Sequence, residues 1–171
     1  VYPGVPEMLQ AVRDMGKKVI LATSKPEVYA KQILQHFALD GYFDAVAGSE
    51  MDGSRTKKAE VITRALELLG NPDVRDCVMI GDREHDVLGG AAHGMDTIGV
   101  TFGYGSEDEL RMSGATHIAH TPEEIVSIKE NLKRAFGRET IEVSLKLENL
   151  LRKKDKDKFK YIIGEQFVFW Q

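Results

Sequence analysis

Two aspartates that follow an apolar segment are the residues of this sequence best suited to chemistry. The segment runs from Cys77 to Ile80, and Gly81 separates it from Asp82 and Asp86, which lie four residues apart. If a helix begins just after Gly81, both carboxylates lie on one face of it. Hard cations such as Mg²⁺ bind carboxylate oxygens together with the phosphate oxygens of a substrate. An alternative stays open at this point, with Asp82 as a helix N-cap and Asp86 as a solvated acid of the first turn.

Two further groups suited to phosphate binding follow other predicted strands. Thr23 and Ser24 come after an apolar strand and before a helix that Pro26 opens. A hydroxyl and backbone N–H groups at this position form an anion-binding site. Lys57 and Lys58 stand at the start of another predicted helix. A hydroxyl, an ammonium and a carboxylate pair at one sheet edge are suited to phosphoryl chemistry. Each group alone also fits a helix cap or a solvated surface, so it is their order along the chain that favours one shared site.

The elements that must position these residues alternate between strands and helices. Strands are predicted over 17–23, 43–47, 77–80, 96–102 and 117–119, and helices over 7–15, 26–39, 58–69 and 84–92, with further helices opened by Ser106 and Thr121. This alternation predicts an α/β fold with a three-layer, Rossmann-like parallel sheet and helices on both faces. Because such sheets bind ligands at the carboxyl ends of their strands, we expect the three polar groups to converge there.

Composition narrows the class of protein. A chain of 171 residues, 42% hydrophobic and 29% charged, suits one globular domain with a short appendage. The net charge of -4 argues against a nucleic-acid partner, and no apolar run reaches the roughly 18 residues of a membrane helix. Cys77 is the only cysteine, which is typical of a reducing compartment, so a cytoplasmic location is expected. No signal peptide is visible, and the start at Val1 rather than Met suggests that the natural polypeptide begins earlier.

Taken together, the motifs resemble those of the haloacid dehalogenase superfamily, and within it the phosphoglycolate phosphatase-like group. The matching segments are 2–5, 19–26, 48–58, 80–86, 99–105 and 121–124. The resemblance covers about residues 1–130, and its most specific motif is the Gly-Asp-x-x-x-Asp sequence that begins at Gly81. It implies Mg²⁺-dependent hydrolysis of a phosphoric monoester through an aspartyl-phosphate. The implied substrate is a small phosphorylated metabolite.

The resemblance also implies roles for the phosphate-binding residues. Thr23 and Lys58 are the catalytic candidates. Thr23 would bind the transferring phosphoryl group with help from the backbone of Ser24. Lys58 would stabilise the charge that is shared by nucleophile and phosphate, and Lys57 is the less favoured choice for this role.

For the metal, the resemblance implies two carboxylates. Asp82 would be a Mg²⁺ ligand, and Asp86 would support the metal site, partly through hydrogen bonds to groups around it. Residues 103–106 are expected to line the same pocket. Mg²⁺ is therefore the expected cofactor.

The family's nucleophile has no counterpart in the recognisable motifs. In the family, an Asp-x-Asp motif on the first strand supplies the nucleophile and the general acid/base, and this strand and an inserted cap precede the segment that begins here at Tyr2. The sole Asp-x-Asp sequence, Asp155-Lys156-Asp157, lies in a lysine-rich stretch without an apolar strand before it. We therefore expect a sheet that lacks its N-terminal central strand, and little or no turnover by this chain.

The residues after 130 are expected to form a tail, 131–171, distinct from a core of residues 1–130. Residues 139–151 fit a helix by length, but their apolar residues also alternate as in a strand. Residues 161–163 or 167–169 are predicted as a strand that could fill the gap in the sheet.

Two other functions stay open from the sequence. The absent nucleophile also fits a non-catalytic module that binds phosphate, metal or a protein partner. A dinucleotide-binding domain would share the alternation of strands and helices, but it needs a glycine-rich turn after the first strand, where this chain has Thr23-Ser24-Lys25-Pro26. The physiological substrate and the oligomeric state are left open.

Overall fold

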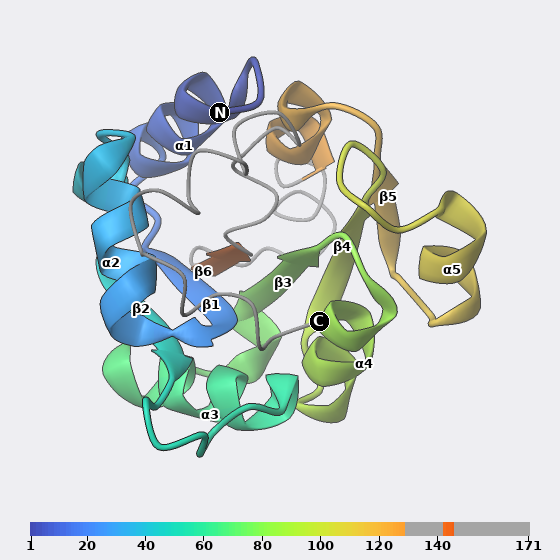
Figure 1. The fold of residues 1–171 in the computed structure, drawn as a ribbon. Helices are drawn as coiled ribbons and strands as arrows, with labels where there is room; N and C mark the ends of the chain where they lie inside the picture. Colours follow the sequence, from blue (N-terminus) through green and yellow to red (C-terminus); the bar gives the residue numbers. More distant parts are fainter. Residues whose placement is uncertain (129–141, 146–171) are drawn as a thin grey trace.

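A six-stranded parallel sheet forms the centre of the computed structural model, which describes residues 1–128 and 142–145 (Figure 1). The strand order is β2-β1-β6-β3-β4-β5. The strands are β1 (Val19–Pro26), β2 (Ala45–Ser49), β3 (Cys77–Gly81), β4 (Asp96–Val100), β5 (His117–Ala119) and β6 (Glu142–Leu145). The labelled helices are α1 (Val5–Asp14), α2 (Glu27–His36), α3 (Lys58–Leu68), α4 (Glu84–Ala92) and α5 (Glu107–Met112), with short 3-10 helices η1 (Asp40–Tyr42) and η2 (Val74–Asp76). Residues 122–128 are also helical, as predicted for the helix that Thr121 opens.

Helices cover both faces of the sheet, because alternate residues of each strand point to opposite sides. In β1, Val19 and Leu21 belong to the core that includes α1 and α2, whereas Ile20 and Ala22 pack with residues of α3. Because Val19 to Ala22 of β1 are buried on both faces, this part of the strand is a continuous apolar run rather than an alternating one. The predicted α/β class with a parallel sheet is therefore confirmed.

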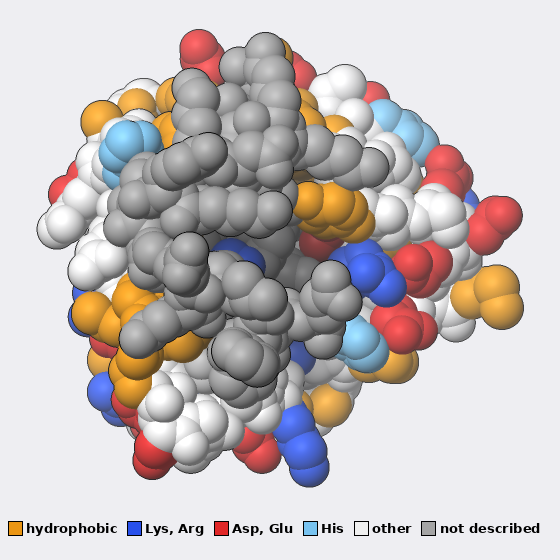
Figure 2. Space-filling model, viewed as in Figure 1, with side chains coloured by type: hydrophobic (Ala, Val, Ile, Leu, Met, Phe, Trp, Pro, Cys, Tyr) orange, Lys and Arg blue, Asp and Glu red, His pale blue; other side chains and the backbone are white. Residues whose placement is uncertain are grey.

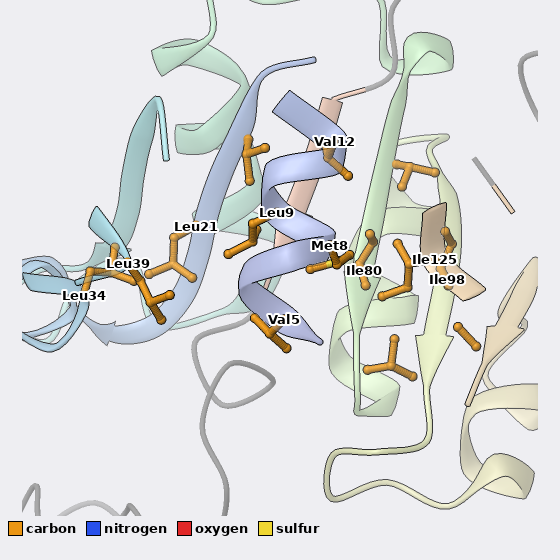
Figure 3. Close-up of a cluster of buried hydrophobic side chains, with 14 of the residues drawn as sticks. Val5, Met8, Leu9, Val12, Leu21, Leu34, Leu39, Ile80, Ile98 and Ile125 are labelled. Carbon is orange, nitrogen blue, oxygen red and sulfur yellow. The ribbon is translucent and has the colours of Figure 1, made fainter. Parts of the chain in front are cut away.

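Helix α1 provides one side of the larger core. Its buried residues recur at helical spacing, so one stripe faces the sheet. Figure 3 shows Leu9 directed toward Leu21 of β1 and Met8 toward Ile80 of β3. The helix thereby spans the two strands whose carboxyl ends carry the predicted phosphate-binding and metal-binding residues.

Most predicted elements lie where the sequence placed them, and the differences are at their ends. Strand β1 continues to Pro26, which is the N-cap of α2 rather than its first residue. Strand β4 ends at Val100, before the predicted end at 102. Within 1–128 and 142–145, no helix has the length and apolar character needed to cross a membrane.

Strand β6 corrects the expectation of an empty position in the sheet. It pairs in parallel with β1 through Leu145 and Leu21, and with β3 through Leu145 and Ile80. Residues 142–145 therefore occupy the position between β1 and β3. For residues 139–151 the sequence left a helix or a strand open, and 142–145 form a strand. The physical reason for a partner here is that buried edges of β1 and β3 would leave backbone N–H and C=O groups unsatisfied. Residues 155–157, 161–163 and 167–169 lie outside the described part of the chain.

Candidate functional site

Lys58 connects the middle of β1 to the first turn of α4. Its Nζ donates a hydrogen bond to the backbone carbonyl of Ala22 at 3.0 Å and lies 3.0 Å from Asp86 Oδ1. Ala22 directly precedes Thr23, and helices α3 and α4 pack against each other (Figure 1). The structure therefore gathers Thr23, Lys58 and Asp86, which come from three separate elements, at one edge of the sheet.

The ion pair between Lys58 and Asp86 is buried. The Lys58 side chain is 5% exposed and that of Asp86 is 0% exposed. Burying two charges is costly, and the short ion pair and the bond to the Ala22 carbonyl offset that cost. The lysine stem fits because Gly89 of α4 has no side chain, and a Cβ there would lie 2.7 Å from Lys58 Cγ. Lys57, by contrast, is exposed and begins α3 as its N-cap.

Asp82 and Asp86 have different positions relative to α4. The helix begins at Glu84, and its N-cap is Arg83, so Asp82 lies between strand and helix. The backbone N–H of Arg83 donates to Asp86 Oδ2 at 3.2 Å. Both aspartates are fully buried. The alternative of Asp82 as the N-cap and Asp86 as a solvated acid is therefore wrong, because the helix starts two residues after Asp82 and its first turn packs on Lys58.

The loop after β4 wraps closely around Asp82. The backbone N–H of Tyr104 donates to Asp82 Oδ2 at 2.8 Å, and that of Gly105 donates to the Asp82 carbonyl at 2.9 Å. A Cβ on Gly103 would lie 2.3 Å from Asp82 Cβ, and one on Gly105 would lie 2.1 Å from the Asp82 carbonyl oxygen. Only glycine permits these approaches. The segment 103–106, which the sequence placed at the pocket, thus orients the Asp82 carboxylate.

Tyr2 also lies near this carboxylate. Its ring packs edge-to-face on Phe102, with the ring centroids 5.8 Å apart. Burial raises the pKa of Tyr2, and the nearby Tyr104 and the negative charge of Asp82 raise it further. The phenol therefore remains protonated beside Asp82 at neutral pH.

Sequence reasoning missed a contact that Glu109 makes with the start of α4. Glu109 Oε1 accepts hydrogen bonds from Arg83 Nε at 2.7 Å and from the backbone N–H of Glu84 at 2.9 Å. The predicted capping box is therefore only half formed: the hydroxyl of Ser106 accepts from the Glu109 N–H, while the carboxylate bonds to the α4 start. The hydrogen bond to Arg83 lowers the pKa of Glu109 and raises that of Arg83. No local signal predicts a contact between residues 26 positions apart.

Within β1, after its apolar residues, Thr23 is fully buried and Ser24 is exposed. The Thr23 hydroxyl oxygen accepts a hydrogen bond from the Lys25 N–H at 3.2 Å, which forms a local turn. A hydroxyl that accepts through one lone pair keeps its proton for donation, so Thr23 retains the capacity to bind an anion.

A pocket of about 430 Å³ opens beside these residues. It lies between the start of α3 and the outer side of α4 and is lined by Ser24, Thr56, Lys57, Lys58, Ala59, His85, Leu88, Gly89 and Ala92. Its volume falls in the range of small-molecule sites. Of the predicted site residues, Ser24, Lys57 and Lys58 line this pocket, whereas Thr23, Asp82, Asp86 and residues 103–106 do not.

The Asp82 carboxylate is suited to be one of several ligands of a Mg²⁺ ion. No cluster of three His, Cys, Asp or Glu side chains is found within residues 1–128 and 142–145, and the Asp86 carboxylate already pairs with Lys58. Mg²⁺ is commonly held by one or two carboxylates, with water and substrate phosphate as its other ligands. Asp82, a buried carboxylate with an oxygen fixed by a backbone N–H, matches that requirement. Asp86 fits better as the group that holds Lys58.

Comparison with known proteins gives curated relatives that match most of this chain. The chain is 49% identical over 117 residues to a 5'-nucleotidase of Pseudomonas aeruginosa, covering 68% of this chain and 52% of that protein. It is 41% identical to the tyrosine-protein kinase PtkA of Mycobacterium tuberculosis, covering 80% of this chain and 45% of that protein. It is 30% identical to a phosphoglycolate phosphatase of Neisseria meningitidis, covering 81% of this chain and 58% of that protein.

A solved structure supports the same relationship. A predicted phosphatase from Clostridium acetobutylicum superposes with a TM-score of 0.74 at 44% identity, covering 77% of this chain and 60% of that one. The chain spans about half the length of the curated relatives that it matches. Residues 1–94, which include Thr23, Lys58, Asp82 and Asp86, match the family description of haloacid dehalogenase-like hydrolases. The chain belongs to the haloacid dehalogenase-like hydrolase family, and its homologues include phosphoglycolate phosphatases.

Proposed function

We propose that this chain carries the phosphate-binding and Mg²⁺-binding part of a phosphoric monoester hydrolase that acts on a small phosphorylated metabolite. The observation that carries the proposal is the position of Lys58, whose ammonium bonds to the backbone beside Thr23 and to Asp86. A buried cation next to a buried hydroxyl forms an environment suited to the oxygens of a phosphoryl group.

In this proposal each side chain has one task. Thr23 donates its hydroxyl proton to a phosphoryl oxygen, and the backbone of Ser24 binds a second oxygen. Lys58 neutralises charge on the phosphoryl group, and Asp86 holds the ammonium in place. Because the ion pair fixes Lys58 before a ligand binds, little reorganisation is needed in the transition state.

Asp82 is the proposed Mg²⁺ ligand. The Tyr104 N–H fixes one of its carboxylate oxygens, so the carboxylate is oriented before the ion arrives. When bound, Mg²⁺ would neutralise charge on the phosphate oxygens. The loop after β4 then serves to hold the Asp82 side chain at the carboxyl end of β3.

The names of the relatives support phosphate chemistry, but they differ in the kind of molecule on which the named enzyme acts. They include a 5'-nucleotidase, a phosphoglycolate phosphatase and a tyrosine-protein kinase. The site described above contains groups that are suited to bind a phosphoryl oxygen and a metal. We assign hydrolysis of a small phosphate ester because two of the three names are those of phosphatases of small molecules.

A calorimetric titration of the chain with Mg²⁺ and then with orthophosphate tests this proposal. We expect Asp82→Asn to weaken Mg²⁺ binding by about 10-fold or more, and Thr23→Val to weaken orthophosphate binding while Mg²⁺ binding is retained. Thr63→Val, in the exposed part of α3, is the matched control. If the unaltered chain binds neither ligand, the proposed function is wrong.

A second candidate, a non-catalytic phosphate-binding and Mg²⁺-binding module, is favoured by one sequence observation. The sole Asp-x-Asp sequence of the chain is Asp155-Lys156-Asp157, in a lysine-rich stretch. Hydrolysis of 4-nitrophenyl phosphate with Mg²⁺ separates the two candidates, and we expect little or no turnover by this chain. Robust turnover that survives Asp82→Asn would contradict the assigned site.

A further inference from the structure

The guanidinium of Arg83 carries a positive charge close to the carboxylate that is proposed to bind Mg²⁺. Arg83 directly follows Asp82 as the N-cap of α4, and its side chain is 41% exposed. A guanidinium keeps its charge at any ordinary pH. Such a charge repels Mg²⁺ and can itself pair with the Asp82 carboxylate. The binding of Mg²⁺ at Asp82 therefore depends on where the Arg83 charge is held.

Glu109 of α5 binds this guanidinium. Its Oε1 accepts hydrogen bonds from Arg83 Nε at 2.7 Å and from the backbone N–H of Glu84 at 2.9 Å, so two donors fix the carboxylate. The hydrogen bond to Glu109 raises the pKa of Arg83 most, and the charges of Asp82 and Glu84 raise it further. Asp82 is thus within electrostatic reach of the guanidinium. Within residues 1–128 and 142–145, however, the direct ion pair of Arg83 is with Glu109.

The segment that carries Glu109 is held close to Asp82 and Arg83. Helix α5 lies beside α4 (Figure 1). Just before α5, the Gly105 N–H donates to the Asp82 carbonyl, and the Ser106 hydroxyl accepts from the Glu109 N–H. A Cβ on Gly105 would lie 3.5 Å from Arg83 Cδ, so the stem of Arg83 packs on this loop. The loop and the first turn of α5 therefore fix Glu109 at the guanidinium.

From these observations we propose that Glu109 is a positioning residue of the metal site, which holds the Arg83 charge away from Asp82 and so leaves the Asp82 carboxylate available to Mg²⁺. The proposal rests on the proposed function, because it takes Asp82 as the Mg²⁺ ligand. It assigns α5 a part in ion binding, and it makes Arg83 a competitor of Mg²⁺ when Glu109 is lost.

Calorimetric titration of the chain with Mg²⁺ tests this role. Glu109→Ala should weaken Mg²⁺ binding by about 10-fold, as the loss of groups around a metal ligand does. Arg83→Ala, added to Glu109→Ala, should restore the affinity to within about two-fold of the unaltered chain, because the two residues act as one coupled pair. The alanine removes the competing charge and retains the backbone N–H that bonds to Asp86. If Glu109 only held α5 on α4, the second substitution would restore nothing.

Glu107→Ala is the matched control. It removes a carboxylate from the same helix and leaves Arg111 without that exposed partner. At about 0.15 M salt, which screens distant exposed charges, it should change the affinity for Mg²⁺ less than about two-fold.

Glu109→Gln keeps the test valid if Glu109→Ala does not fold. The amide oxygen can still accept from the Glu84 N–H, but it does not neutralise Arg83. We expect this variant to bind Mg²⁺ more weakly than the unaltered chain, and we expect added Arg83→Ala to reverse that loss.

Three outcomes would overturn the proposal. Unchanged Mg²⁺ affinity in Glu109→Ala or Glu109→Gln would overturn it and leave the proposed function standing. A loss of affinity that Arg83→Ala does not reverse would show that Glu109 does not act through the Arg83 charge. If the unaltered chain binds neither Mg²⁺ nor orthophosphate, both this role of Glu109 and the proposed function are wrong.

Discussion

Lys58 and Asp86 show how one buried pair organises the site. The ion pair joins the first residue of α3 to the first turn of α4, and the bond to the Ala22 carbonyl connects the pair to β1. Because both side chains are buried, water cannot solvate either charge if the other partner is removed. Removal of one partner therefore leaves an uncompensated charge in the interior.

We accordingly expect Asp86→Ala to lower the free energy of unfolding by about 3 kcal/mol, as for other broken buried pairs. Urea unfolding measures this change. Glu107→Ala, which removes an exposed partner of Arg111, is the control and should cost about 1 kcal/mol or less. Equal losses in the two variants would mean that the buried pair has no special role.

Glu109 gives a pH-dependent prediction. Its hydrogen bond to Arg83 lowers its pKa in the folded state, so the folded chain binds fewer protons than the unfolded chain. The stabilisation is complete above the unfolded pKa of about 4.3 and is lost as the pH falls through the lower folded pKa. Glu109→Gln should therefore make the loss of stability below about pH 5 less steep.

Thermal or urea unfolding at several pH values between about 3 and 7 would measure this slope. Asp108→Asn, on the neighbouring residue of α5, is the control that removes the same charge. A slope that both variants leave unchanged would show that Arg83 does not stabilise the Glu109 carboxylate.

At the scale of elements, the loop between β4 and α5 depends on glycines to reach Asp82. A Cβ on Gly103 would overlap the Asp82 side chain, at 2.3 Å from its Cβ, so the loop or the carboxylate must move. This contact connects β3, β4 and α5 at the site. The motif around Asp82 thus extends beyond the strand and helix that carry it.

We expect Gly103→Ala to lower the free energy of unfolding by about 1–3 kcal/mol, as overpacking does, and to weaken Mg²⁺ binding. Gly41→Ala is the control, because a Cβ there meets no atom within 4 Å. Urea unfolding and calorimetric titration measure the two effects. Wild-type values for Gly103→Ala in both would contradict the close packing of the loop on Asp82.

At the scale of the whole molecule, β6 unites the two halves of the sheet. One half contains β2 and β1, the other contains β3, β4 and β5, and β6 pairs with both. The residues proposed to bind phosphate lie on the first half and those proposed to bind Mg²⁺ on the second. The relative position of the two sets therefore depends in part on this strand.

A proline in β6 tests that dependence. Val143→Pro removes a backbone N–H within a strand that pairs on both sides, so we expect weaker protection of the β1 and β3 amides from hydrogen exchange. Val143→Ala retains the N–H and serves as the control. Unchanged protection in the proline variant would mean that β6 does not hold the halves together.

On the surface, the described side chains visible in Figure 2 show basic and acidic groups interspersed over the face. Neither sign of charge gathers into one broad area among the described side chains of this view.

The sequence by itself determined the elements and the order of the polar groups. Apolar runs and helix signals are local, so the α/β class, the limits of α4 and β5, and the positions of Lys58 and Asp82 at element ends could be read directly. Thr23 was expected at the end of its strand and lies within β1. The family resemblance followed from the same local motifs.

Only the tertiary structure decided how these groups meet. The bonds of Lys58 to Ala22 and Asp86, and of Glu109 to Arg83, join residues more than 20 positions apart, and no periodicity encodes them. The choice of 142–145 as the central strand was likewise beyond the sequence, because several tail segments have strand-like patterns. Which one pairs depends on the edges that β1 and β3 present after they have packed.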